Sequence, residues 1–125
     1  MVIAAAVIAV GLLALLAVFQ FCVAAGVPWG RFVWGGRHEV LPAALRVGSG
    51  VSVLLYLGFA WILLSRAGVL AGGGTPLVTV AAWVLVGYFA LGVGLNLMSH
   101  SPAERWTMAP ACLVLAGCAL VIALA

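Results

Sequence analysis

The sequence predicts an all-α integral membrane protein: a four-transmembrane-helix bundle of two helical hairpins, with an arginine- and tryptophan-rich first loop. Two observations predict this class. Of the 125 residues, 68% are hydrophobic and only 6% are charged, whereas soluble domains are roughly half apolar and a quarter charged. Four apolar runs also follow one another, each close to the ~20 residues that cross a bilayer core. We therefore expect one transmembrane domain over residues 1–125.

The first two spans are expected at residues 2–25 and 42–65. The first run is interrupted only by Gln20 and ends at Gly26, with Pro28 just beyond, which is a typical helix stop. No basic segment precedes this run, and it is longer than the apolar core of a signal peptide. We therefore expect a retained helix and not a cleaved leader.

The third and fourth spans are expected at residues 76–98 and 102–125. Thr75 is a suitable N-cap for the third, with proline at the first helical position. Ser101 and Glu104 form a capping-box pattern, in which each side chain bonds the other residue's backbone N–H. Pro110 is expected to kink or restart the fourth helix and to leave a short interfacial turn before the last apolar stretch.

The arginines set the expected orientation. Connections 26–46 and 99–106 share one face and carry four arginines, whereas the 65–76 turn opposite has only Arg66. Because cytoplasmic loops are enriched in basic residues, we expect both long loops in the cytoplasm and both termini outside, in an inner or plasma membrane. The chain has no lysine, and its Ala/Gly/Arg-rich composition is typical of bacteria with GC-rich genomes.

Short polar side chains gather at the cytoplasmic ends of the helices. An amide in hydrocarbon needs a partner inside the bundle, so Gln20 and Asn96 are expected to face inward and to meet each other. One interpretation is a polar cavity roofed by the first loop, and the other is a structural cluster that fixes helix packing. The predicted intramembrane cluster comprises Gln20, Ser49, Ser52, Asn96 and Ser99.

Small residues recur at four-residue spacing on two spans. Gly48 and Ser52 lie on the second, and Ala90 and Gly94 on the third. Such pairs allow close contact between helices, either within one chain or between copies.

The first loop contains Trp-Gly-Arg followed by Trp-Gly-Gly-Arg. Glycines let backbone N–H groups approach an anion, arginines bind phosphate, and tryptophans lie at headgroup depth, so an anionic lipid headgroup is a natural ligand. The alternative is a loop that only sets topology and anchors the interface. The candidate ligand-binding residues are Trp29, Arg31, Trp34, Arg37, His38, Arg46 and Arg105.

No catalytic, cofactor or metal motif stands out. His38, Glu39, His100 and Glu104 could be drawn as a metal site or as acid–base pairs, but capping explains Glu104 and neighbouring arginines explain Glu39. The three cysteines have neither a Cys-x-x-Cys nor a Cys/His metal spacing. We expect no cofactor. Enzymatic activity stays open as a less favoured hypothesis, in which His38 or His100 would act in lipid chemistry.

The favoured hypothesis is an accessory or binding protein that engages anionic lipid or a partner membrane protein at its cytoplasmic face. Five arginines cannot form the basic stripe that nucleic acid requires. The alternative is a small homo-oligomeric transporter or channel for an anionic or neutral solute. Its lining residues would be Gln20, Ser52, Tyr56, Tyr88 and Asn96. In size and number of spans the chain is similar to small multidrug exporters, but their first helix carries an acidic residue and this one does not.

Overall fold

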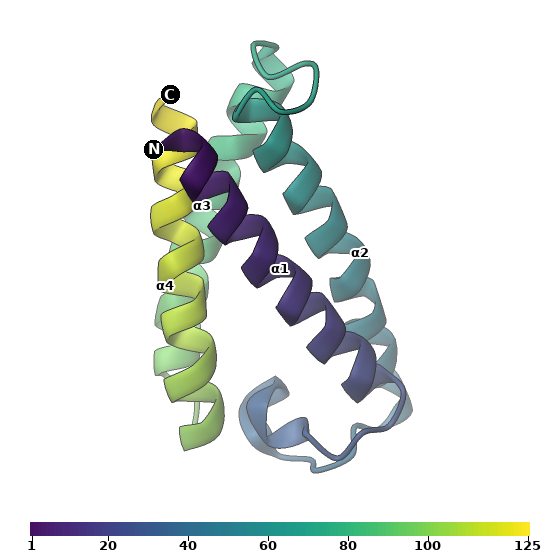
Figure 1. Ribbon diagram of the computed structural model, residues 1–125. Coiled ribbons are helices and arrows are strands. Elements are labelled where there is room, and N and C mark those ends of the chain that lie inside the picture. The colour runs from purple at the N-terminus through teal and green to yellow at the C-terminus, as the bar shows by residue number, and fades with distance from the viewer.

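The computed structural model describes residues 1–125 as four long helices, which Figure 1 shows as a bundle. They are α1 (Val2–Ala24), α2 (Ala43–Arg66), α3 (Pro76–Leu97) and α4 (Pro102–Leu124), with two short 3-10 turns in the first loop, η1 (Gly30–Phe32) and η2 (Trp34–Gly36). Each long helix is apolar enough to cross a membrane. α1 packs mainly on α2 and α3 mainly on α4, so the predicted class of two helical hairpins is confirmed.

The helices end where local sequence signals place their ends. After α1, Gly26 has φ +106°, and the N–H groups of Gly26 and Val27 donate to the carbonyls of Val23 and Cys22. This is a Schellman motif, which favours glycine because only glycine enters the left-handed region without strain. At the start of α3, the Thr75 hydroxyl accepts from the N–H of Val78. The predicted N-cap is therefore confirmed.

The fourth helix differs from the expectation at Pro110. α4 runs without interruption from Pro102 to Leu124 with Pro110 inside it, so the predicted restart and interfacial turn are wrong. The missing N–H frees the carbonyl of Trp106, one turn earlier. Trp106 is exposed near the end of the bundle, where water or headgroups can satisfy that carbonyl. A helix in a membrane tolerates proline when the freed group finds such a partner.

The larger of the two buried clusters fills the half of the bundle that holds the chain termini. There, small residues of α1 lie in one buried cluster with α4 residues such as Cys118 and Ala119 and with larger side chains from α2 and α3. Small side chains let helices approach closely. Figure 1 shows α1 close to α4 near the termini and diverging from it toward the first loop.

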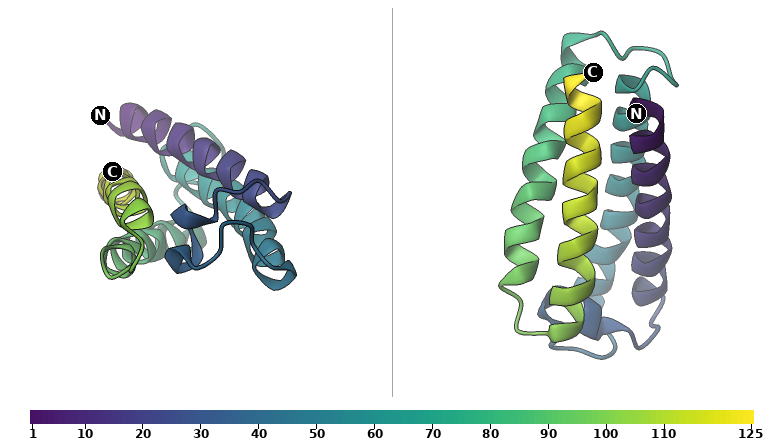
Figure 2. Two further views of the ribbon diagram at one scale, coloured as in Figure 1. Left: turned by 90° about the horizontal axis from the view of Figure 1, so that it is seen from below. Right: turned by 60° about the vertical axis from the view of Figure 1, so that its left-hand side comes forward.

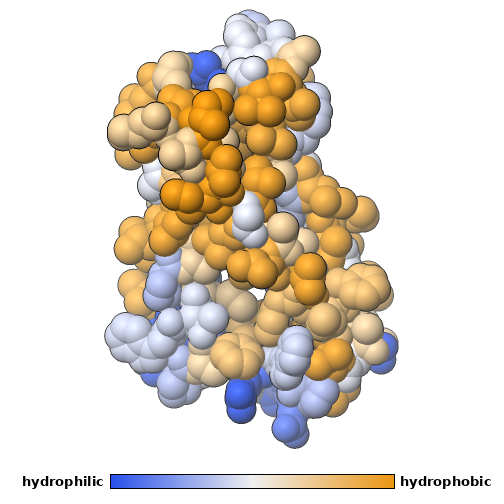
Figure 3. Space-filling view, in the orientation of Figure 1, coloured by the Kyte–Doolittle hydropathy of each residue, from blue (hydrophilic) through white to orange (hydrophobic).

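The first loop fills the end where the hairpins separate. Seen from that end, it lies between α1/α2 and α3/α4 (Figure 2, left). Val33 and Leu41 of the loop are buried with Val23 of α1 in a second small cluster. Polar side chains gather at the two ends of the molecule, and the body between them is largely apolar (Figure 3).

The close packing of α1 predicts a size limit at Ala9, which is 0% exposed. Ala9→Leu should lower the free energy of unfolding by about 1–3 kcal/mol, because the added atoms overfill the core. Ala14→Leu, an exposed position on the same helix, is the matched control and should change little. Unfolding in mixed micelles with increasing dodecyl sulfate measures both, and equal effects would contradict this packing.

Candidate functional site

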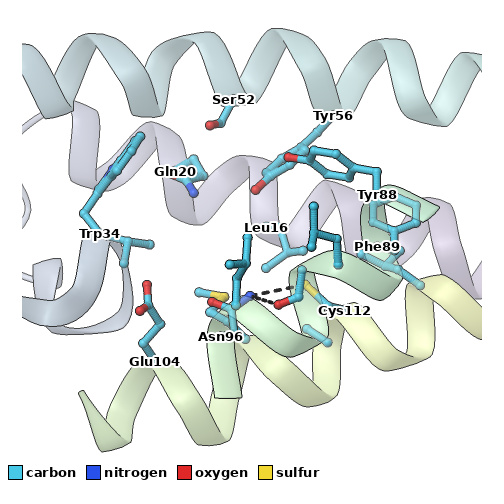
Figure 4. Close-up of a pocket in the computed structure, with 17 residues that line it drawn as sticks. Leu16, Gln20, Trp34, Ser52, Tyr56, Tyr88, Phe89, Asn96, Glu104 and Cys112 are labelled. Carbon is cyan, nitrogen blue, oxygen red and sulfur yellow. Dashed lines mark hydrogen bonds between the residues drawn. The ribbon is translucent and has the colours of Figure 1, made fainter. Parts of the chain in front are cut away.

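The main cavity of the protein lies beneath the first loop, in the half where the hairpins diverge. Its volume is about 430 Å³, and side chains from all four helices and from η2 line it. This volume falls within the range of sites that bind small molecules, roughly 300–1,000 Å³. The lining is mostly apolar, with a few polar groups projecting inward (Figure 4).

The polar lining includes the whole set proposed for a solute pathway. Gln20 comes from α1, Ser52 and Tyr56 from α2, and Tyr88 and Asn96 from α3, and all five line the same cavity. Three further lining residues carry side-chain hydrogen-bonding groups and were not in that set: Trp34 of the loop, and Glu104 and Cys112 of α4. The predicted polar cluster thus divides, because Ser49 and Ser99 lie outside the lining.

Gln20 and Asn96 share the cavity but do not hydrogen-bond to each other, contrary to expectation. The Asn96 amide donates to the carbonyl of Gly92 at 2.8 Å and to Cys112 Sγ at 3.5 Å. The Gln20 Oε1 atom is buried without a hydrogen-bond partner. The two amides therefore do not act as a mutual lock between α1 and α3.

Trp34 forms the roof of the cavity and is held there by α2. Its indole Nε1–H donates to Ser49 Oγ at 3.0 Å, and Ser49 is 0% exposed. The indole also lies against Gly48, where an added Cβ would approach ring carbons to 2.8 Å. Gly48 therefore makes room for this side chain, and the expected close helix contact instead occurs at Gly92, whose added Cβ would lie 3.1 Å from Cys112 Sγ.

The loop reaches this position through a left-handed turn. Trp34, Gly35 and Gly36 have φ of +53°, +78° and +72°. A bulky residue in this region is strained by roughly 1–3 kcal/mol, so the surrounding contacts must hold it. An added Cβ at Gly36 would lie 2.4 Å from the Ser101 side chain, and Ser101 Oγ in turn donates to the carbonyl of Arg31 at 2.6 Å. The turn is thereby docked on the start of α4.

Glu104 plays a different part from the one predicted. Ser101 Oγ accepts from the N–H of Glu104 at 3.4 Å, which is half of the expected capping box. The other half is absent, because the Ser101 N–H donates to Ser99 Oγ and the Glu104 carboxylate accepts from the N–H of Gly35 at 3.4 Å. Glu104 is 8% exposed and lines the cavity. The capping pattern accounted for Glu104 within its own helix and so gave no sign of a contact with the loop. Gly35, which makes that contact, is distant in sequence.

The arginines have different surroundings. Arg46 donates from Nε to the carbonyl of Ala24 at 2.7 Å, which stabilises the end of α1. Arg31 stacks 4.9 Å from the ring of Phe32, and Arg105 lies over its neighbour Trp106. Arg37 and His38 are exposed on the outside of the loop. At the opposite end, Arg66 donates to the carbonyls of Ala123 and Ala125.

The residues considered for a metal site are not assembled, and Trp29 contacts α1. No group of three or more His, Cys, Asp or Glu side chains lies close enough to hold a metal ion, so His38, Glu39, His100 and Glu104 do not form one centre. Trp29 stacks on Phe19 with 5.9 Å between ring centroids. It therefore holds the loop against the end of α1.

The Trp34 hydrogen bond predicts a difference between two serines of α2. Ser49→Ala leaves the indole N–H without its partner and should weaken the loop's docking by about 0.5–1.5 kcal/mol. Ser52→Ala is the control, because the Ser52 hydroxyl bonds only the carbonyl of Gly48 in its own helix. Amide hydrogen exchange at residues 33–36 should become faster in Ser49→Ala alone, and similar exchange in both variants would contradict the docking.

Comparison with protein-family models, with curated proteins and with solved structures found no match for this chain. The site is a largely apolar chamber in a four-span membrane bundle, with a tryptophan as its roof and one buried carboxylate in its lining.

Proposed function

We propose that the protein is a membrane-embedded binding protein that takes an amphipathic molecule from the surrounding bilayer into the cavity beneath its first loop. The observation that carries this proposal is the cavity itself, with an apolar wall and a few polar groups at the loop end. An amphipathic molecule matches both parts, because its chain can replace lipid contacts while its head meets the polar groups.

A binding role is favoured over a channel by what lies beyond the cavity. Toward the termini, the interior is filled by large buried side chains from every helix, among them Leu13, Leu63, Leu85 and Leu115. A pore through this half would need those side chains to move apart. The alternative, a homo-oligomeric transporter, retains one supporting observation, since its five proposed lining residues do share the cavity.

The outer face of the loop supports a second contact with lipid. Arg31, Arg37 and His38 are exposed there, and Trp29 is 45% exposed. Basic and aromatic side chains at this depth attract anionic headgroups around the protein. In this proposal they seat the loop end at an anionic leaflet, and the cavity takes the bound molecule.

Filling the cavity tests the binding role. Ala111 lines it from α4, and Ala111→Phe should weaken the binding of tritium-labelled decanol by roughly tenfold, because about two buried CH₂ groups are displaced. Ala90→Phe, on an exposed face of α3, is the matched control. Binding is measured on protein in phosphatidylcholine nanodiscs, with empty nanodiscs subtracted.

Two results, one from this experiment and one from a flux assay, would overturn the binding role. One is equal decanol binding by the wild type and by both phenylalanine variants, which are first shown to be helical by circular dichroism. The other is downhill solute flux into proteoliposomes that Ala111→Phe abolishes, which would favour the transporter.

We also propose that the loop end is cytoplasmic, because four of the five arginines lie there and only Arg66 lies at the end with the termini. In a variant without the three native cysteines, Arg37→Cys should react with a membrane-impermeant maleimide in inside-out vesicles and not in intact cells. Gly74→Cys, in the exposed opposite turn, should show the reverse, and exchange of the two patterns would invert the orientation.

A further inference from the structure

We infer that the cavity selects an organic cation, with the positive group of the bound amphipathic molecule lying at Glu104. This inference rests on the proposed binding role and names the ligand class for the same cavity. Glu104 is the only charged residue that lines the cavity, and no arginine or histidine lines it. The electrostatic character of the chamber is therefore set by one carboxylate, although the chain as a whole has a net charge of +3.

The Glu104 carboxylate has unused capacity to bind a positive group. It is 8% exposed, and its side chain accepts a single hydrogen bond, from the Gly35 N–H at 3.4 Å. A carboxylate offers about four acceptor positions, so most remain free. Burying a charge without a counter-charge is costly, and a cation in the cavity removes that cost.

Glu104 also lies at a helix position that favours a negative group. The residue lies in the first turn of α4, with Ser101 as the N-cap. The positive end of the helix dipole stabilises a negative group there. The carboxylate is shown directed from α4 into the space that faces Gln20 and Trp34 (Figure 4).

Aromatic side chains provide the second, independent feature of a cation site. Trp34, Tyr56, Tyr88 and Phe89 all line the same cavity. Trp34 directly precedes Gly35, the residue bonded to Glu104, so its ring and the carboxylate lie at the same end. Aromatic faces attract ammonium groups by cation–π interaction, more strongly when the site is desolvated.

Other ligand charges match this lining poorly. An anionic head would be placed beside a carboxylate with no basic side chain in the lining, and like charges repel each other. A metal ion would need several oxygen, nitrogen or sulfur ligands, and no such group of His, Cys, Asp or Glu is present. The apolar lining, with Leu16, Leu91, Leu95 and Met108, accepts an alkyl chain attached to the cation.

Three probes with the same alkyl chain test the inference on the full protein in phosphatidylcholine nanodiscs. They are tritium-labelled decyltrimethylammonium, decanol and decyl sulfate, each corrected for partition into empty nanodiscs. The cation should bind roughly tenfold or more tightly than decanol, and decyl sulfate most weakly. In Glu104→Gln this preference for the cation should disappear while decanol binding stays.

The matched control is Glu39→Gln, which removes the only other acidic residue of the chain. Glu39 is exposed on the loop and does not line the cavity, so this variant should keep the preference for the cation. If Glu104→Gln does not fold, the order of the three probes on the wild type still decides. Equal binding of the cation and decanol, or a preference for decyl sulfate, overturns the inference.

These outcomes are distinct from failure of the binding role. Charge-independent binding that Ala111→Phe weakens would leave the binding role intact and refute the cation site. Absence of binding by all three probes would refute both.

The cation has two possible sources, an amine-headed lipid of the bilayer or a free amphipathic cation that partitions into it. Native mass spectrometry of the protein released from its own membrane separates them. An amine-headed lipid that stays bound in the wild type and is displaced by decyltrimethylammonium identifies the lipid source. Binding of the probe to protein that carries no such lipid identifies the free cation.

Discussion

The close approach of α1 to α4 near the chain termini determines the rest of the architecture. Alanines of α1 and small residues of α4 belong to one buried cluster there, and helices in lipid associate through such close packing because they lack a hydrophobic driving force. Since α1 diverges from α4 toward its other end (Figure 1), the hairpins separate and leave space that the helices alone do not fill. The cavity is thus a geometric result of tight packing at the opposite end.

The first loop folds into the space between the two hairpins (Figure 2). Its backbone enters the left-handed region at Trp34, Gly35 and Gly36, which directs the indole toward Ser49 and the Gly35 N–H toward Glu104. The same segment therefore has two faces with different chemistry. Its outer side carries basic residues, whereas the buried Val33 and the partly exposed Trp34 line a largely apolar chamber with one carboxylate.

The helices could be predicted from the sequence because hydrophobic length and local caps are properties of short segments. Thr75 and Gly26 act within a few residues of where they stand, and the structure places them as expected. Pro110 shows the limit of local rules, because the cost of a missing N–H depends on what surrounds the freed carbonyl.

Only part of the candidate site could be predicted from the sequence, for a related reason. Polar residues on apolar helices marked Gln20, Ser52 and Asn96, but the roles of Trp34 and Glu104 depend on contacts with partners distant in sequence. No pattern within the loop or within α4 encodes that pairing.

The one-sided position of the cavity has a consequence for exchange with the bilayer. Its lining comes from the loop-side halves of the helices, whereas the other half is closed by the core. In the proposed binding role, a molecule that enters laterally would do so from the loop-side leaflet, and its occupancy would follow the composition of that leaflet. In a membrane whose two leaflets differ in lipid content, the proposed binding would therefore depend on one monolayer and not on the other.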